Sequence, residues 1–180
     1  MGDSLATMEA STTETESATQ TRPLGDSWTL WAHLPHDTDW SIDSYKPILT
    51  FNTVESAISV TEVLPDQLIK NCMLFLMRKG IQPTWEDERN RAGGCFSYRV
   101  STRQIVPTWK DLSYALVGET LAPKAAVQSR VNGITISPKK NFSVFKVWLS
   151  DCSCQNPTEI SEVQAVVPHG CLFKKHTPEY

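Results

Sequence analysis

The chain has 180 residues, of which 40 % are hydrophobic and 21 % are charged, a composition typical of one globular domain with a sizeable core. Its formal net charge of −3 excludes the strongly basic surface of a protein that coats duplex nucleic acid. No apolar run approaches the roughly 18–20 residues that a membrane-spanning helix needs, so we expect no membrane association.

The first 21 residues differ in composition from the rest. They are rich in Ser, Thr and Glu and contain no lysine or arginine. We therefore predict a disordered acidic tail at residues 1–21 and one domain over residues 22–180. This tail has neither the basic start nor the apolar stretch of a signal peptide. The five cysteines are expected to be reduced thiols in a cytoplasmic protein, with the nucleus as a second compartment.

Alternating hydrophobic residues predict the first strand at residues 28–34, because every second side chain of a half-buried strand points into the core. Trp28, Leu30, Ala32 and Leu34 form this alternation. In chain order, further strand-like segments lie at 48–51, 73–78, 95–101, 126–135, 143–149 and near 171–174.

Three helices are predicted between these strands. The first lies between the second and third strands, where Asn52 is suited to cap it and Pro65 to end it. The second follows Thr108 and runs toward Gly118, and the third has Asn156 as its cap. Several neighbouring strands have no helix between them, which argues against a parallel α/β sheet. We therefore predict an α+β fold with a mostly antiparallel sheet and about three helices on one face.

Trp40, Trp85, Trp148 and Glu86 are the strongest candidates for a binding site. Trp85 and Glu86 are neighbours in a polar segment, and Trp40 follows a polar loop. Aromatic rings beside a carboxylate suit a flat, cationic, hydrogen-bond-donating ligand. N7-methylguanine is such a ligand, because its ring is cationic and its edge offers the N1–H and N2–H donors. Stacking on indoles adds cation–π energy.

Alternative roles for these residues remain open on the pattern alone. Trp40 is also interpretable as a core residue that folds back, and Trp148 as one member of an apolar strand. Glu86 is followed by Asp87 and Glu88, so it is also interpretable as a solvated acid in an acidic turn.

These residues belong to a series of short blocks. The blocks are Trp28-Thr29-Leu30-Trp31, Phe51-Asn52-Thr53-Val54-Glu55, residues 80–88, Gly93-Gly94, Leu116-Val117-Gly118-Glu119 and Val147-Trp148. In this order and spacing, residues 22–150 resemble the eukaryotic translation initiation factor 4E family, of which the chain looks like a divergent member. The resemblance implies a curved antiparallel sheet with helices on its convex side and a slot for the mRNA 5′ cap on its concave side.

The resemblance also assigns roles within that slot. Trp40 and Trp85 match the family's two stacking tryptophans. Glu86 matches the carboxylate that accepts N1–H and N2–H of the base, and Trp148 matches the tryptophan that contacts the N7-methyl group.

The phosphate-binding positions depart from the family pattern. Lys139 falls where the family has an arginine, Val144 where it has a lysine, and Cys95 where it has a further arginine. Lysine binds phosphate as a point charge, without the bidentate fork of arginine. The candidates to compensate, each also interpretable as an ordinary surface residue, are Lys140, Lys146, Arg99, Lys174 and Lys175.

The convex surface, on which the family docks a helical peptide, also departs from the pattern. Ile58 stands where the family has a central tryptophan, and Lys110 where it has a leucine. The residues at or near other matching positions are Pro23, Val54, Asp111 and Tyr114. The expected partner is a factor 4G-like scaffold or a 4E-binding regulatory protein that docks through an altered motif.

Other classes of protein receive less support. Cys152, Cys154, His169 and Cys171 offer four soft ligands for a zinc-stabilised module, but Cys-x-Cys is tighter than usual zinc spacing. A cysteine hydrolase would use Cys95 with His169 but lacks a third residue, and a decapping phosphohydrolase would need metal-binding carboxylates on a helix. We predict a binding protein without catalytic activity, metal or cofactor, which either promotes initiation or represses translation by occupying caps.

Overall fold

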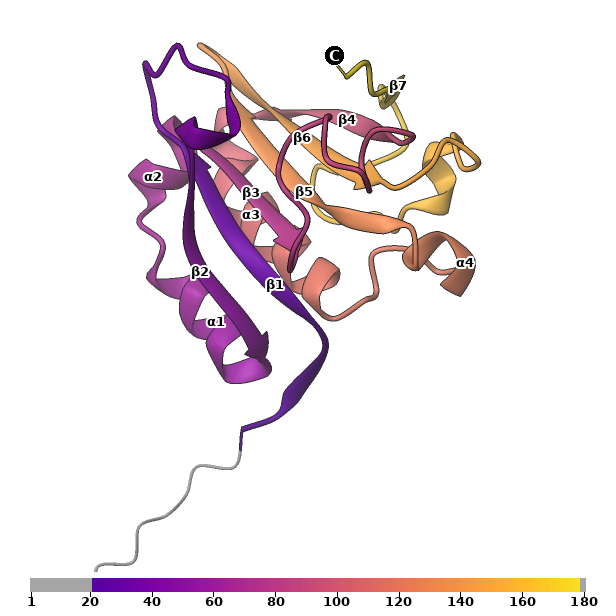
Figure 1. Cartoon of the computed structure of the whole chain (residues 1–180), viewed down its shortest axis with the longest axis horizontal. Coiled ribbons are helices and arrows are strands. Elements are labelled where there is room, and N and C mark those ends of the chain that lie inside the picture. Colours follow the sequence, from indigo (N-terminus) through magenta and orange to yellow (C-terminus); the bar gives the residue numbers. More distant parts are fainter. Residues whose placement is uncertain (1–20, 179–180) are drawn as a thin grey trace, which may run out of the picture.

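The computed structural model describes residues 21–178, so the predicted tail lies, apart from Thr21, outside the described residues. Seven strands form one antiparallel, curved sheet in the order β2-β1-β3-β5-β6-β4-β7 (Figure 1). The strands are β1 (Pro23–His33), β2 (Tyr45–Thr53), β3 (Met73–Arg78), β4 (Gly94–Ser101), β5 (Val131–Pro138), β6 (Phe142–Leu149) and β7 (Leu172–Lys175). The predicted α+β class with an antiparallel sheet is confirmed.

Four α-helices accompany the sheet: α1 (Val54–Val63), α2 (Asp66–Asn71), α3 (Ile105–Val117) and α4 (Ala125–Gln128). Helix α3 contacts α1, α2, β1 and β5, and Figure 1 shows it behind β3 and β5. Short 3₁₀ turns lie at Ile42–Ser44, Thr102–Gln104 and Pro157–Glu159. No helix within residues 21–178 is long and apolar enough to cross a membrane.

The sheet is apolar on both faces, and β3 shows this most clearly. Leu74 and Leu76 belong to the main core cluster, which includes residues of α3 such as Trp109. Phe75 and Met77 point to the opposite face and belong to a second cluster. Because successive strand residues alternate between faces, a continuous apolar strand is what a sheet covered on both sides requires. The second cluster is the base on which the candidate site is built.

Two predicted helix starts need correction, and the third predicted helix is shorter than an α-helix. Helix α1 is capped by Thr53, whose hydroxyl oxygen accepts from Ser56 N at 3.2 Å, and Asn52 belongs to β2. Helix α3 begins at Ile105, so Thr108 is an interior, fully buried residue. A buried threonine can mimic a cap in sequence because only its burial, which is non-local, tells the two apart. The third predicted helix is the 3₁₀ turn at Pro157–Glu159, and Asn156 caps it as expected.

Several strand boundaries also differ from the prediction. Strand β1 starts at Pro23 and not at Trp28, and β2 spans Tyr45–Thr53 and not only residues 48–51. The segment 126–135 was expected to be one strand, but its first part lies in α4 and the strand β5 starts at Val131. Leu34 lies one residue beyond β1 and is 51 % exposed, so it does not continue the buried alternation. Helix α2 was not predicted, although Pro65 precedes its first residue and therefore separates it from α1.

Candidate functional site

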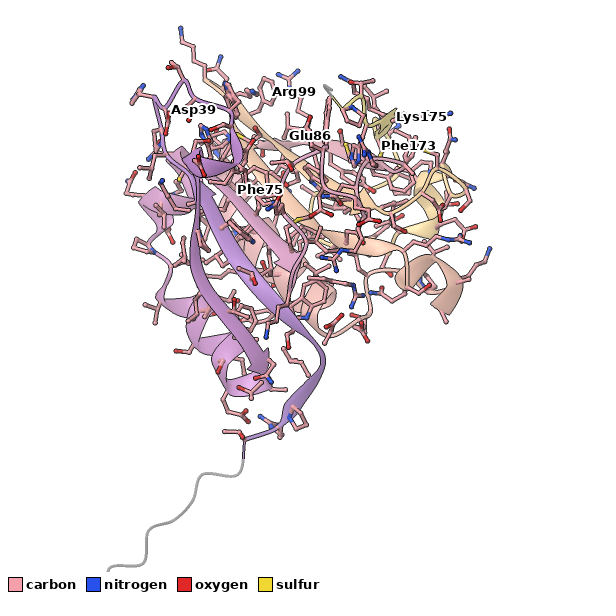
Figure 2. The ribbon with its side chains drawn as sticks, viewed as in Figure 1. Asp39, Phe75, Glu86, Arg99, Phe173 and Lys175 are labelled. Atoms are coloured by element: carbon pink, nitrogen blue, oxygen red, sulfur yellow. The ribbon has the colours of Figure 1, made fainter. Side chains whose placement is uncertain are left out.

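A cleft of about 940 Å³ opens on the face of the sheet that carries the second apolar cluster. Its lining comes from the β1–β2 loop, from β2 and β3, from the loop between β3 and β4, from β6 and from the segment after β7. In Figure 2 the labelled Asp39 and Glu86 lie to either side of the labelled Phe75. The lining residues are Trp40, Ser41, Ile42, Tyr45, Met73, Phe75, Gln82, Pro83, Thr84, Trp85, Glu86, Lys146, Trp148 and Thr177. Four site residues from the sequence, Trp40, Trp85, Glu86 and Trp148, are thus brought together.

Trp148 is held rigidly in this lining. It is 3 % exposed, and its indole N–H donates to Thr135 Oγ1 at 2.7 Å. Phe75 meets its ring edge to face, with centroids 6.5 Å apart. A buried indole N–H without an acceptor would be destabilising, so Thr135 fixes the orientation in which Trp148 presents itself to the cleft.

Trp40 stands on the β1–β2 loop and is 59 % exposed, which contradicts the interpretation of Trp40 as a core residue. The preceding residue organises the loop: Asp39 accepts from Ser41 N and Ser41 Oγ, each at 2.8 Å. These two bonds, followed by smaller contributions including the charges of His33 and Lys46, lower the pKa of Asp39. One face of the Trp40 ring stacks on His33, with centroids 4.2 Å apart and planes 6° apart.

Trp85 stands on the opposite wall, and its loop is held from within by Asn90. This fully buried side chain donates to the carbonyl oxygens of Gln82 and Thr84, both at 2.9 Å. Asp87 accepts from Gln82 N at 2.8 Å and from Arg89 N at 2.9 Å. The loop therefore has a defined shape without regular secondary structure, because its backbone groups are satisfied by its own side chains.

Gly93 allows this loop to return to the sheet. A Cβ atom at this position would collide with the Leu149 carbonyl oxygen, so only glycine fits. The Gly93-Gly94 pair seen in the sequence thus has a packing role beside the cleft.

The three consecutive acids of the Trp85 loop lie in different places. Glu86 is exposed and lines the cleft, whereas the carboxylate of Asp87 is used inside the loop. Glu88 is exposed and lies outside the cleft lining described here. Burial, and secondarily the charge of Glu86, raises the pKa of Tyr45 on the opposite wall. The carboxylate that faces the cleft is thus the one that directly follows Trp85.

Of the candidate phosphate-binding lysines, one lines the cleft and a second contacts one of its tryptophans. Lys146 on β6 lines it, and the Lys174 ammonium lies 5.2 Å from the centre of the Trp85 ring. Both flank Cys95: Lys174 is its partner across β4–β7, and Lys146 pairs with the nearby Ser97. Burial raises the pKa of the Cys95 thiol, and the charges of both lysines act in the opposite direction. Two amino groups therefore surround the position where the family has an arginine.

The remaining cationic candidates lie elsewhere. Lys139 lines a separate recess of about 210 Å³, which shares Trp40 and Met73 with the cleft. Lys140 is exposed on the β5–β6 turn, outside the described lining of both cavities. Arg99 packs over the Phe142 ring at 4.0 Å.

The helix-covered face carries the residues proposed for partner docking. On α1, Ile58 is 45 % exposed. On α3, Lys110 donates to Glu62 Oε2 at 2.5 Å, and Tyr114 donates to Glu62 Oε1 at 2.7 Å. Asp111 accepts from Gln164 at 2.5 Å. Pro23 starts β1 in an exposed position and Val54 starts α1 half-buried.

Sequence reasoning missed several residues of both regions. Tyr45, Met73 and Phe75 line the cleft, and the only local signal was that both faces of residues 73–78 are apolar. Glu62, which bridges the two helices, had no signal in a pattern because its partners are 48 and 52 residues away. Asn90 was also missed, although two of its partners, Gln82 and Thr84, are only 8 and 6 residues away.

The cysteine-based alternatives find little support in the described part. All five thiols are free, and Cys95 is 1 % exposed with a raised pKa, which is the opposite of an activated nucleophile. Within residues 21–178, no group of three or more His, Cys, Asp or Glu side chains is placed to hold a metal ion.

Comparison with known proteins identifies relatives of the whole fold. A family model described as "Eukaryotic initiation factor 4E" matches residues 23–174. The chain is 30 % identical over 137 residues to eukaryotic translation initiation factor 4E of Candida glabrata, covering 72 % of this chain and 64 % of that protein. It is 33 % identical over 150 residues to factor 4E-2 of Schizosaccharomyces pombe, covering 78 % of this chain and 58 % of that protein. The chain thus spans less than two thirds of these relatives' length.

Solved structures agree with this likeness. The C. elegans factor eIF4E-3, in complex with the 4E-binding protein Mextli and a cap analog, superimposes with a TM-score of 0.67 at 25 % identity and covers 74 % of this chain and 77 % of that chain. The Ascaris suum factor eIF4E-3 in complex with the m7G cap gives a TM-score of 0.65 at 25 % identity, covering 74 % and 76 %.

Proposed function

This chain belongs to the eukaryotic initiation factor 4E family, and on that premise we propose that its cleft binds the 7-methylguanosine cap of mRNA in translation initiation. The observation that carries the proposal is the cleft with Trp40 on one wall and Trp85 and Glu86 on the other. A methylated guanine is flat and cationic, and it fits between two indoles. Cation–π attraction to such rings contributes about 2 kcal/mol when the cation is desolvated.

In this proposal Glu86 reads the edge of the base. A carboxylate accepts two hydrogen bonds in parallel, as N1–H and N2–H of guanine require, and such charge-assisted bonds are the stronger kind. Trp148, fixed by Thr135, contacts the N7-methyl group. Adenine lacks this pair of donors, so the carboxylate selects guanine.

The phosphates are proposed to run toward Lys146 and Lys174. Lys146 lines the cleft and Lys174 lies over the Trp85 ring, whereas Lys139 lies in the adjoining recess. Lys139, and Lys140 beside it, remain candidates for the distal phosphate or the first mRNA nucleotide. Lysine in place of arginine still attracts the phosphates but does not impose bidentate hydrogen-bond geometry on them. We therefore expect the site to tolerate modified phosphate chains.

We further propose that the helix-covered face docks a factor 4G-like scaffold or a 4E-binding regulatory protein. Structures of two similar proteins contain such partners: C. elegans eIF4E-3 with Mextli, and the schistosome factor with m7GpppA and 4E-BP, which matches at a TM-score of 0.67 and 26 % identity over 74 % of each chain. The choice of the helix-covered face rests on the family resemblance of its residues. The altered residues Ile58 and Lys110 favour an altered docking motif. They also support a second candidate role, a cap-binding repressor that does not recruit the usual scaffold.

We propose a binding protein without enzymatic activity. Translation places it in the cytoplasm, and five free thiols fit a reducing compartment, which includes the nucleus as a second location.

The test is quenching of tryptophan fluorescence by 7-methyl-GTP and by GTP. We expect strong quenching by the methylated nucleotide and far weaker quenching by GTP, because only the methylated ring is cationic. Glu86→Gln should weaken binding, and Glu88→Gln is the matched control, since it removes a neighbouring exposed charge outside the cleft. Equal quenching by both nucleotides would rule out the proposed stacking of a cationic base.

A further inference from the structure

Trp40 and Trp85 each stack on one buried histidine. His33 is 3 % exposed and stacks on Trp40 with centroids 4.2 Å apart and planes 6° apart. His176 is 6 % exposed and stacks on Trp85 with centroids 5.6 Å apart and planes 17° apart. An indole has two faces, so stacking on one histidine leaves a second face of each ring for other contacts; at Trp85 the Lys174 ammonium also lies 5.2 Å from the ring centre.

Each histidine is tied to the loop that carries its tryptophan. A ring nitrogen of His33 lies 2.8 Å from the carbonyl oxygen of Asp39, the residue before Trp40. A ring nitrogen of His176 lies 2.7 Å from the carbonyl oxygen of Asn90, whose side chain holds the Trp85 loop. Because a carbonyl oxygen only accepts, both rings donate at these contacts. One ring comes from the end of β1 and the other follows β7, so both loops are anchored to the sheet.

We propose that His33 and His176 are positioning residues that hold Trp40 and Trp85 as two open platforms, and that a bound ligand completes a stack of five rings. This inference rests on the proposed cap-binding function, because it supposes a flat cationic base between the two indoles. A platform that is already ordered does not lose side-chain entropy when the ligand binds. The exposure of Trp40, at 59 %, makes this support important, since a free indole on a loop would sample several rotamers.

The neutral form of His176 suits this role. Its pKa is lowered chiefly by burial and also by Lys146 on β6, while the Asn90 contact and Glu86 on the Trp85 loop act in the opposite direction. Lys174, two residues earlier on the chain, also lies at the Trp85 ring. His176 Nε2 is buried and has no hydrogen-bond partner among residues 21–178. A proton there would place a second positive charge in the same stack as a cationic base.

The surroundings of His33 differ. Its ring contacts Tyr45 edge to face at 5.2 Å. The charged groups around it include Asp39 and Lys46, and also Asp37 and Lys139, which line the same recess as His33. The carboxylate of Asp39 is already bonded to Ser41. The role of His33 is therefore tested by replacing its ring. The role of His176 is tested both by replacing its ring and by changing the pH.

The test is a pair of double-mutant cycles, read as the dissociation constant for 7-methyl-GTP. His176→Ala should weaken binding about 3- to 10-fold, the range expected for one aromatic pair, and His33→Ala should do the same. The double variants Trp85→Ala with His176→Ala and Trp40→Ala with His33→Ala should each lose clearly less than the sum of the two single losses, because each histidine acts mainly through its tryptophan. For His176 a remainder is expected, since its ring also contacts Trp148 at a centroid distance of 4.8 Å. His169→Ala is the matched control, since this histidine is exposed and lies outside the lining of the cleft. Additive losses in both cycles would overturn the proposal.

Ring-conserving variants separate positioning from general stability. His33→Phe should retain most of the wild-type affinity. His176→Phe should weaken binding less than His176→Ala at pH 8. Its affinity should also fall less than that of the wild type when the pH drops below the lowered pKa of His176 in the folded protein. Parallel pH profiles would overturn the role of the neutral His176 ring.

The outcomes also separate this inference from the proposed function. If the wild type does not bind 7-methyl-GTP, the proposed function and this inference both fail. If the wild type binds, and Trp40→Ala and Trp85→Ala abolish binding while the histidine variants leave it unchanged, only the positioning role fails.

Discussion

The two candidate surfaces of this protein differ in how far they keep the family's residues. In the cleft, Trp40, Trp85, Glu86 and Trp148 come together as the resemblance implies. On the helix-covered face, the expected tryptophan and leucine are absent, and Lys110 is bound to Glu62. A methylated base always presents the same cationic ring and the same donors, so few other residues could bind it. A peptide partner can change together with the surface that it contacts, and its site is freer to diverge.

The largest expected effect lies in the cleft. Trp40→Ala or Trp85→Ala should each cost about 1–3 kcal/mol of 7-methyl-GTP binding, because each removes one of two stacked rings. Calorimetric titration measures this loss. Neither change should alter binding of a peptide to the helix-covered face, since the sheet lies between the two regions. A similar loss at both surfaces would show that the two regions are not independent.

The next effect concerns the helix-covered face. A helical peptide with the family's tyrosine-and-leucine motif should bind at least about 2 kcal/mol more weakly than to a family member with the usual tryptophan, because the indole that covers the peptide leucine is replaced by Ile58. The peptide must also displace Lys110 from Glu62. Ile58→Trp combined with Lys110→Leu should restore part of the affinity without changing cap binding.

Calorimetry with one such peptide tests this prediction, and Lys110→Leu alone is the matched control. Tight binding by the wild type would contradict the prediction and would remove the main support for a repressor role.

A smaller effect is expected from the lysines of the cleft. Lys146→Ala and Lys174→Ala should each weaken 7-methyl-GTP binding by up to about 1 kcal/mol, the range for exposed charge pairs, and should leave binding of 7-methylguanosine unchanged. With few phosphate contacts, the salt dependence should be shallow.

Lys139→Ala decides between the resemblance and the geometry. The resemblance places Lys139 at a phosphate position, whereas the structure places it in the adjoining recess. If Lys139→Ala costs more than Lys146→Ala, the phosphates run past Trp40 toward that recess instead.

Local patterns predicted the sheet well because its strands carry their signal in a few adjacent residues. The segment 73–78 was predicted with its observed bounds, since a continuous apolar strand between polar ends has no good alternative. Helix starts were less predictable. Thr108 looked like a cap, but it is buried inside α3, and burial depends on the packing of distant elements.

The candidate site shows the same division. The resemblance alone selects Glu86 among the three consecutive acids. The structure shows how Glu86 differs from Asp87, because the Asp87 carboxylate accepts hydrogen bonds from backbone N–H groups of its own loop. His33 and His176 lie 143 residues apart in sequence (176−33) and yet cover equivalent faces of two tryptophans. No pattern in a single sequence predicts such an arrangement, since it depends on which loops pack against the end of β1 and the segment after β7.

The smallest predicted effect is the pH dependence of stability that His176 contributes. Burial lowers its pKa in the folded state, so the unfolded chain binds the proton more readily. The free energy of unfolding should therefore be unaffected by this group above about pH 6.5, the ordinary histidine pKa, and should decrease as the pH falls below it. His176→Phe should flatten this decrease, whereas His169→Phe, at an exposed histidine, should not. Urea unfolding of the three proteins at pH 7.5 and pH 5.5 measures the difference. If wild type and His176→Phe lose the same stability on acidification, then His176 takes up its proton as easily in the folded protein as in the unfolded chain, and the cleft tolerates a charge behind Trp85.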